Sequence, residues 1–394
     1  MNVATSERSG IRLEAWSPKN CISRFLRTGN GGIGGCIQHD DLDYAASLGF
    51  AAISANNGHD GMTGEPFNNP DVVTDFSWRS LHSGVVVGKQ LVETFYGASH
   101  NKSYYLGCST GGRQGFKAVQ DFPGDFNGIV AGAPAVAFTG MIYWSGSLLT
   151  VTGTPEDPTF VPTNAWLSII HDEVLKQCDA LDGAADGLLE NPDLCNFDVT
   201  PLVCAEGNST NCLSKTQAAT VRTLLNPINW YRYVVYNDTT WDPVTLSLDD
   251  YTVARAQNPA DIETYSGDLS ASAAAGGKVL HYHDLVDGLI TSDNSKRYYA
   301  HVQQTMNKQP AELDEFYRVF PISGMSHCFG APGTTPDENV LMSMVRWVEE
   351  GVAPEVVRGA DANGTYWRAH CKWPKTNKYV GPGAYEDESA WQCS

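Results

Sequence analysis

The stretch SYYLGCSTGGRQGFKAVQ, residues 103–120, decides the fold. It opens with a β-prone apolar run at 103–106, passes through the turn Gly107-Cys108-Ser109-Thr110-Gly111-Gly112, and continues as a helical pattern at 113–120. The glycine-flanked serine fits G-x-S-x-G, in which small neighbours allow a serine to stand on a sharp strand-to-helix turn. This pattern predicts Ser109 as a nucleophile; the simpler alternative is a structural glycine turn.

Strand and helix patterns alternate around this turn. Strands are predicted at 11–15, 50–54 and 128–131, and helices at 43–48 and 85–95. Strands that alternate with helices form parallel sheets with right-handed crossovers. We therefore predict an α/β-hydrolase fold with a mainly parallel central sheet.

The alternation lapses between about Ala137 and Gly277 and resumes at the strand Lys278–Tyr282. This lapse predicts a discontinuous catalytic domain, residues 1–137 plus 277–394. The intervening residues 138–276 are expected to form an inserted lid domain.

A serine nucleophile needs a base, and in this fold the order along the chain is serine, acid, histidine. His327 lies in the glycine-bracketed loop 323–330, before the last long helix, and is predicted to be the base. The other downstream histidines fit structural positions: His171 in the insertion, His281 and His283 on a strand, His301 on a helix face, and His370 near the terminus.

The acid should follow a strand and precede the histidine. Asp284 and Asp287 both follow the strand at 278–282, and Asp293 comes later. Asp287 is favoured because Gly288 lets the chain bend at that point, whereas Asp284 is more typical of a loop carboxylate that caps backbone N–H groups.

The oxyanion formed in such a reaction needs two N–H donors. Thr110, directly after the nucleophile, is predicted to supply one, and Gly32, in the glycine-rich loop 29–35, the other. The alternative for this loop is a plain tight turn.

Ten cysteines are present, several in closely spaced pairs that predict disulfides: Cys178/Cys195, Cys204/Cys212 and Cys371/Cys393. No CxxC motif occurs, which argues against zinc and thiol-redox sites. Cys108 and Cys328 directly adjoin the predicted nucleophile and base. If Ser109 and His327 meet, their neighbours fall within disulfide range. A Cys108 thiolate nucleophile is disfavoured, because the residue before an elbow serine points into the fold.

Sequons at Asn101, Asn208, Asn237 and Asn363, together with the cysteines, favour a secreted glycoprotein, although residues 1–19 show no signal-peptide pattern. The formal net charge of −19 disfavours nucleic acid as a partner. No apolar run reaches the roughly 18 residues of a membrane span.

The insertion contains an aspartate-rich stretch with two glycines. The predicted ligands are the side chains of Asp179, Asp182 and Asp186 and the carbonyls of Ala184 and Leu188. Crowded oxygen donors of this kind suit calcium rather than a transition metal, and the spacing differs from that of an EF-hand. The metal would be structural, since serine chemistry needs none; the alternative is a solvated acidic turn.

These motifs resemble the tannase and feruloyl esterase family from near Ile11 to the end of the chain. The resemblance is carried by 29–32, 107–115, 123–129, the aspartate loop, the turn at Asp287 and 324–328. It implies a Ser109–Asp287–His327 triad, a Cys108–Cys328 disulfide, lid-bound calcium and secretion. Relatives carry a further N-terminal cysteine, so the pairing of Cys36 stays open, with Cys21 as one candidate.

The predicted function is hydrolysis of phenolic-acid esters, such as feruloyl or caffeoyl esters of plant cell walls, through an acyl-enzyme. The expected partner is a small phenolic ester or feruloylated saccharide, with no nucleic acid and no membrane; a homodimer is a further expectation. The alternatives are a tannase that cleaves gallate esters and a catalytically inactive carbohydrate-binding relative.

Overall fold

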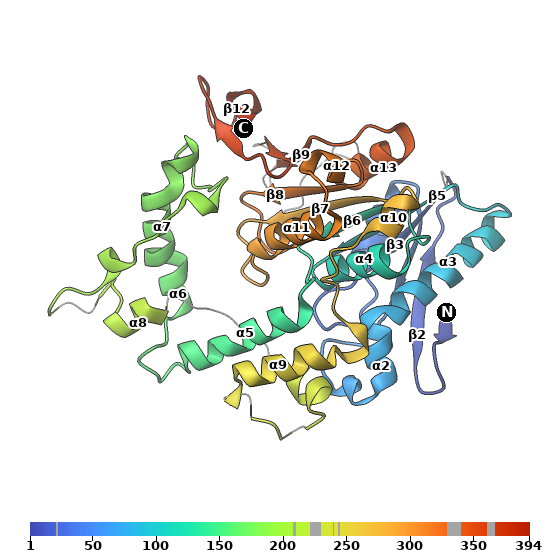
Figure 1. Cartoon of the computed structure of the whole chain (residues 1–394), viewed down its shortest axis with the longest axis horizontal. Helices are drawn as coiled ribbons and strands as arrows, with labels where there is room; N and C mark the ends of the chain where they lie inside the picture. The colour runs from blue at the N-terminus through green and yellow to red at the C-terminus, as the bar shows by residue number, and fades with distance from the viewer. Residues whose placement is uncertain are drawn as a thin grey trace. The chain divides into compact units, whose positions relative to one another are not determined.

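The computed structural model divides into two compact units (Figure 1). The first contains Met1–Phe138 and Asn258–Pro374, and the second contains Thr139–Gln257 and Lys375–Ser394. The structure describes residues 1–20, 23–207, 210–220, 230–238, 240–242, 245–328, 340–360 and 367–394. Within these ranges, no helix combines the length and apolarity needed to cross a membrane.

An eight-stranded sheet in the order β1-β2-β4-β3-β5-β6-β7-β8 forms the centre of the first unit. Its strands are β1 (Asn2–Ala4), β2 (Gly10–Trp16), β3 (Arg24–Thr28), β4 (Ala51–Ala55), β5 (Lys102–Cys108), β6 (Gly128–Gly132), β7 (Lys278–Asp284) and β8 (Tyr317–Ile322). The pairs β1–β2 and β2–β4 are antiparallel, and all other pairs are parallel. The predicted mainly parallel sheet is confirmed.

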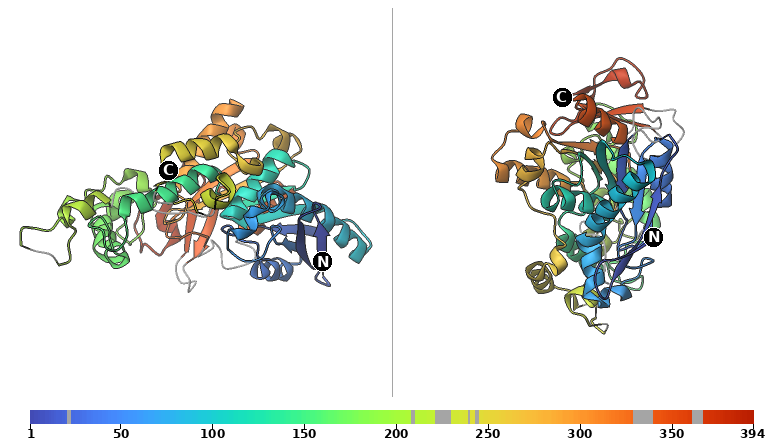
Figure 2. Two further views of the ribbon diagram at one scale, coloured as in Figure 1. Left: turned by 90° about the horizontal axis from the view of Figure 1, so that it is seen from below. Right: turned by 90° about the vertical axis from the view of Figure 1, so that its right-hand side faces the viewer.

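Successive residues of the central strands point to opposite faces of the sheet and build two cores. Tyr105 and Ile129 belong to one core, while their neighbours Tyr104 and Val130 belong to the other. Helices cover both faces (Figures 1 and 2). The first core takes residues from α3 (Ser80–Tyr96), α4 (Thr110–Asp121) and α11 (Asp293–Met306), and the second from α1 (His39–Ser47) and α13 (Val340–Glu350).

The end of the insertion differs from the predicted boundary at 276/277, because residues 258–276 pack with the first unit. Arg113 in α4 donates to the carbonyl of Ile262 at 3.4 Å, and Lys117 Nζ lies 2.6 Å from Asp261 Oδ2. The amide of Thr264 donates to the carbonyl of Val136 at 3.1 Å. These contacts attach the segment to the catalytic unit and move the boundary to 257/258.

The C-terminal residues also differ from the prediction, which placed them in the catalytic domain. Lys375–Ser394 belongs to the second unit. There, Trp391 and Ala390 pack with Ala184 and Tyr379 in one apolar cluster. Tyr379 and Trp391 come from two antiparallel strands, β11 (Asn377–Tyr379) and β12 (Trp391–Cys393).

The second unit has its own apolar cluster, which includes Val161, Ile170 and Leu213. Its principal helices are α5 (Phe138–Thr152), α7 (His171–Cys178) and α9 (Leu248–Gln257). It contains the disulfides Cys178–Cys195 and Cys204–Cys212. Its role as a lid stays a prediction.

Gly112, in the first turn of α4, allows that helix to approach the backbone after β6. A Cβ added there would lie 2.3 Å from the carbonyl oxygen of Gly132 and 2.8 Å from Pro134 Cα. We expect Gly112→Ala to lower the free energy of unfolding by about 1–3 kcal/mol, because backbone must move. Gly124→Ala is the matched control, with no atom within 4 Å of its added Cβ. Equal melting temperatures for the two variants would contradict this account.

Candidate active site

Ser109 stands between the end of β5 and the start of α4, in a conformation that side-chain-bearing residues rarely adopt. Its φ is 64° and its ψ −123°. The turn is tight: a Cβ on Gly107 would lie 2.9 Å from the carbonyl carbon of Gly111. The amide of Ser109 donates to the carbonyl of Gly132 at 3.0 Å. This is the strained strand-to-helix turn that the G-x-S-x-G pattern predicts, and the role of Ser109 as nucleophile stays a prediction.

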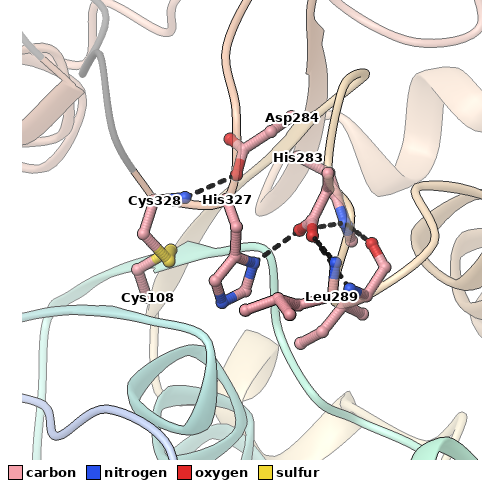
Figure 3. Close-up of a disulfide and its surroundings, with 8 residues drawn as sticks. Cys108, His283, Asp284, Leu289, His327 and Cys328 are labelled. Atoms are coloured by element: carbon pink, nitrogen blue, oxygen red, sulfur yellow. Dashed lines mark hydrogen bonds and ion pairs between the residues drawn. A yellow bond between two sulfur atoms is a disulfide. The ribbon is translucent and has the colours of Figure 1, made fainter. Parts of the chain in front are cut away.

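His327 contacts Asp287 directly: its Nδ1 lies 2.7 Å from Asp287 Oδ2 (Figure 3). The Asp287 side chain is fully buried, whereas that of His327 is 14% exposed. Ser109 and His327 line the same cavity. Among the described residues, no hydrogen bond joins Ser109 Oγ to the imidazole, a contact that commonly tightens only when substrate binds.

The Cys108–Cys328 disulfide ties the elbow to the histidine loop across 220 residues of sequence, with the two Cα atoms 6.0 Å apart (Figure 3). Since Cys108 adjoins Ser109 and Cys328 adjoins His327, the bond limits how far these two residues can separate.

Asp287 is held as a buried anion. Its Oδ1 accepts from the amides of Leu289 and Ile290, both at 2.8 Å. Its Oδ2 accepts from His327 and lies 3.3 Å from His283 Nε2. Burial raises the Asp287 pKa, but these hydrogen bonds lower it more, and the net pKa is well below the usual range. A carboxylate that stays ionised can fix the imidazole tautomer and stabilise the imidazolium.

Asp284 has a different environment. Its buried Oδ2 accepts from the amide of Cys328 at 2.8 Å, and its Oδ1 has no hydrogen-bond partner in the described chain. Burial raises its pKa to about 6. Asp293, the third candidate, is in an exposed ion pair with Arg297 at 3.1 Å. Of the three, the geometry favours Asp287 as the acid and gives Asp284 the backbone contact.

Ligand-type atoms of Asp284, Asp287 and His327 lie within 4.8 Å of one another, as in a metal site. However, two backbone amides and two imidazoles already surround the Asp287 carboxylate. These donors occupy its lone pairs. The arrangement therefore suits a hydrogen-bonded anion better than a metal ligand.

The early glycine loop lies directly against the elbow. Gly32 has a φ of +57°, and its carbonyl accepts from Thr110 Oγ1 at 2.6 Å. Thr110 is the first residue of α4, so its amide has no acceptor within the helix. Both predicted oxyanion residues are thus neighbours beside Ser109; their role in binding an oxyanion stays a prediction.

Sequence reasoning missed the side chains that hold this loop. Gln114 Oε1 accepts from the amide of Asn30 at 3.0 Å, and its Nε2 donates to Asn30 Oδ1 and Asn57 Oδ1 at 3.2 and 3.1 Å. Asn57 donates to the carbonyl of Gly34 at 2.8 Å. The sequence signal for these contacts was weak, because it consisted only of polar residues beside the glycine runs.

A cavity of about 670 Å³ opens at Ser109 and His327. Its walls are mostly apolar side chains, Met62, Leu106, Tyr282, Leu289, Val340 and Leu341. Gln38, Asp41 and Tyr44, on or next to α1, add polar groups. Burial raises the pKa of Asp41 to about 6. An apolar cavity with few polar groups is typical of a small-molecule site.

The aspartate-rich loop of the second unit is closed by its own carboxylates. Asp179 accepts from the amide of Gly187 at 3.0 and 3.1 Å. Asp182 accepts from the amide of Ala184 at 3.1 Å, and Asp186 from that of Leu188 at 3.3 Å. These contacts fold the loop on itself, and the binding of calcium by its carboxylates stays a prediction.

The remaining cysteines and sequons have mixed outcomes. Cys371 and Cys393 are each disulfide-bonded, and their pairing with one another stays a prediction. Cys36 is an exposed free thiol, whereas Cys21 lies outside the described residues. Asn101 and Asn237 are exposed; Asn208 and Asn363 lie outside the described residues.

A parallel sheet, an elbow serine and a buried Asp–His pair beside one cavity define a hydrolase of the α/β-hydrolase fold. A family model described as tannase and feruloyl esterase matches residues 1–232 and 229–394. The chain belongs to this family and is a carboxylic ester hydrolase.

Individual relatives agree with this assignment. The chain is 49% identical to a probable feruloyl esterase B-2 of Neosartorya fischeri, over 100% of this chain and 85% of that protein. Its identity to feruloyl esterase C of Talaromyces stipitatus is also 49%, over 100% and 84%. The crystal structure of feruloyl esterase B from Aspergillus oryzae superposes with a TM-score of 0.95 at 48% identity, covering 100% and 90% of the two chains. Tannin acyl hydrolase from Aspergillus niger, at 22% identity and a TM-score of 0.78 over 99% and 84%, shares the fold.

Asp287 and Asp284 are separable by substitution. We expect Asp287→Asn to lower kcat about 10³- to 10⁴-fold, because an amide no longer fixes the His327 tautomer. Asp284→Asn keeps an acceptor for the amide of Cys328 and should retain most activity, while its pH–rate profile loses any contribution from the carboxyl with a pKa of about 6. The measurement is kcat against pH for both variants. A larger loss in Asp284→Asn would reverse the assignment.

Proposed function

We propose that this chain hydrolyses esters of ferulic and caffeic acids, of the kind found in plant cell-wall material, through an acyl-enzyme on Ser109. The observation that carries the proposal is the 2.7 Å contact between His327 and Asp287, tied to the Ser109 elbow by the Cys108–Cys328 disulfide. The names of the feruloyl esterase relatives support the substrate class.

The mechanism follows from the position of each group. His327 Nε2 takes the proton of Ser109 Oγ as that oxygen attacks the ester carbonyl, while anionic Asp287 stabilises the imidazolium. The amides of Thr110 and Gly32 donate to the oxyanion. His327 then returns the proton to the departing alcohol. Water, activated by the same imidazole, hydrolyses the acyl-enzyme.

The apolar cavity supports a phenolic acyl group, because Leu106, Leu289 and Leu341 offer contact to an aromatic ring and its linker. Tannase activity is the alternative within the family. A galloyl group carries more phenolic hydroxyls than a feruloyl group and needs more polar partners, whereas polar side chains are the minority in this wall. The mostly apolar wall therefore favours feruloyl esters over gallate esters.

We propose a structural calcium ion in the second unit, held by Asp179, Asp182 and Asp186 with the carbonyls of Ala184 and Leu188. Bound there, it would neutralise the crowded carboxylates and fix the loop that the Cys178–Cys195 disulfide encloses. Secretion, with glycans on exposed sequons such as Asn101, is proposed on the strength of the disulfides. The homodimer stays a prediction.

The esterase proposal is tested with methyl ferulate, methyl caffeate and methyl gallate. We expect wild type to prefer the first two in kcat/KM, and Ser109→Ala to lose activity on all three, by about 10⁶-fold in kcat, while keeping its melting temperature. Preference for gallate would make the chain a tannase. Full turnover by Ser109→Ala would reject the serine mechanism. A wild type that binds saccharides but hydrolyses none of the three esters would favour the alternative of a catalytically inactive carbohydrate-binding protein.

Calcium is tested by chelation and thermal unfolding. Calcium at about a hundredfold excess over its Kd should add about 3 kcal/mol to the free energy of unfolding. We expect EGTA to lower the melting temperature of wild type and of Asp249→Asn, whose substituted side chain is an exposed carboxylate of α9 outside the loop. Asp182→Asn should have a lower melting temperature that EGTA no longer changes. The same EGTA shift in all three proteins would refute this site.

A further inference from the structure

A line of buried polar side chains leads away from the active site on the far side of Asp287. Tyr317 OH lies 2.9 Å from His281 Nδ1, and His281 Nε2 lies 2.6 Å from Ser295 Oγ. Ser295 Oγ lies 2.5 Å from His283 Nδ1, and His283 Nε2 lies 3.3 Å from Asp287 Oδ2. β7, β8 and α11 supply the first four residues, the turn after β7 supplies Asp287, and all five side chains are buried.

The direction of this chain follows from its buried end. Tyr317 is 0% exposed, and within the described residues its hydroxyl has His281 Nδ1 as its one hydrogen-bond partner. A buried hydroxyl donates its proton where an acceptor exists. Tyr317 therefore donates to His281, which makes His281 Nδ1 the acceptor and places its proton on Nε2.

The direction of each remaining hydrogen bond follows from the direction of the one before it. His281 Nε2–H donates to Ser295 Oγ, and the one Ser295 proton is then donated to His283 Nδ1. His283 consequently carries its proton on Nε2, facing Asp287 Oδ2 at 3.3 Å and the carbonyl of Ile290 at 2.9 Å. Both of these partners are acceptors, so this tautomer satisfies every atom of the chain.

We infer that Tyr317, His281, Ser295 and His283 form a one-way hydrogen-bond chain that fixes His283 as a neutral donor to Asp287, and that His283 is thereby a positioning residue for the acid of the triad. The inference rests on the proposed triad. Two imidazoles then share one carboxylate oxygen: that of His327, which lines the cavity, and that of His283, which is buried.

The chain matters because a second proton on His283 would neutralise Asp287. A cationic His283 would compete with the His327 imidazolium that forms during the reaction. The neighbouring titratable groups are Asp284 and His327 beside Asp287, and Tyr298 and Tyr299 beside Tyr317. Burial holds the His281 pKa well below its ordinary value, so the link next to Ser295 is uncharged.

The test compares two tyrosines whose ring centroids lie 5.6 Å apart. Tyr317→Phe removes the hydroxyl that sets the direction, and Tyr299→Phe removes one that has no partner among the described atoms. We expect Tyr317→Phe to lower kcat on methyl ferulate about threefold to tenfold with KM unchanged, the loss of one buried hydrogen bond. The acid limb of its kcat profile should also change, because the hydrogen-bond chain no longer fixes the tautomer of His283. Tyr299→Phe should match wild type in both.

Ser295→Ala interrupts the chain at another point and should repeat the effect, which covers the case of a poorly folding Tyr317→Phe. If the folded variants keep the wild-type kcat and the wild-type acid limb of the pH profile, the proposed hydrogen-bond chain is overturned. Imidazole ¹⁵N spectra of Ser109→Ala give a readout independent of turnover: the Nε2–H tautomer of His283 is expected, and the Nδ1–H tautomer would overturn the inference. If wild type is inactive but His283 has the expected Nε2–H tautomer, the proposed function is rejected and the hydrogen-bond chain is supported.

Discussion

The buried charge of Asp287 is the constraint around which the site is organised. A carboxylate with no exposed surface is costly unless hydrogen bonds replace its water. Two backbone amides of the turn after β7 take one oxygen, and two imidazoles approach the other. The turn, the histidine loop and the core side of β7 therefore have to be in place together. The contact with His327, on which the proposed mechanism depends, is one part of this larger requirement.

The fold brings these parts together from distant segments. Ser109 and the amide of Thr110 come from one strand-to-helix turn, whereas His327 arrives on a loop after β8. The Cys108–Cys328 bond joins the turn and the loop at positions next to Ser109 and His327. The glycine loop is attached to the same turn by Gln114 and by the Thr110 hydroxyl. A covalent bond on one side and hydrogen bonds on the other thus hold Ser109 between His327 and the predicted oxyanion donors.

The sequence could predict what local chemistry determines. The elbow at Ser109 is recognisable because its glycines are needed within a few residues of the serine, and the alternating strand patterns were sufficient for a parallel sheet. The choice between Asp284 and Asp287 was less certain, because both follow the same strand and their partners come from elsewhere. The Gln114–Asn30 contact joins residues 84 positions apart, and no local pattern marks it.

The domain boundary was misplaced for a similar reason. Residues 258–276 lack clear periodicity, yet Asp261 and Thr264 are attached to the catalytic unit by Lys117 and Val136. His281 and His283 were expected to be satisfied structural histidines. The spacing of two along a strand places both on one face of β7, but the hydroxyl of Ser295 that links them comes from a helix, which the strand pattern does not reveal.

Asp284, at the end of β7, and Asp287, in the turn that follows, have opposite pKa shifts. Folding lowers the Asp287 pKa, so its contribution to stability is present above the ordinary aspartate pKa and is lost as the pH falls below about 4. Folding raises the Asp284 pKa to about 6, so its contribution is full below the ordinary value and is lost as the pH rises through about 6. Considering these two groups alone, the fold around the site is most stable near pH 4 and loses stability as the pH rises from there to about 6. The hydrogen bonds account for the difference, since Asp287 gathers donors on both oxygens and Asp284 has one oxygen without any in the described chain.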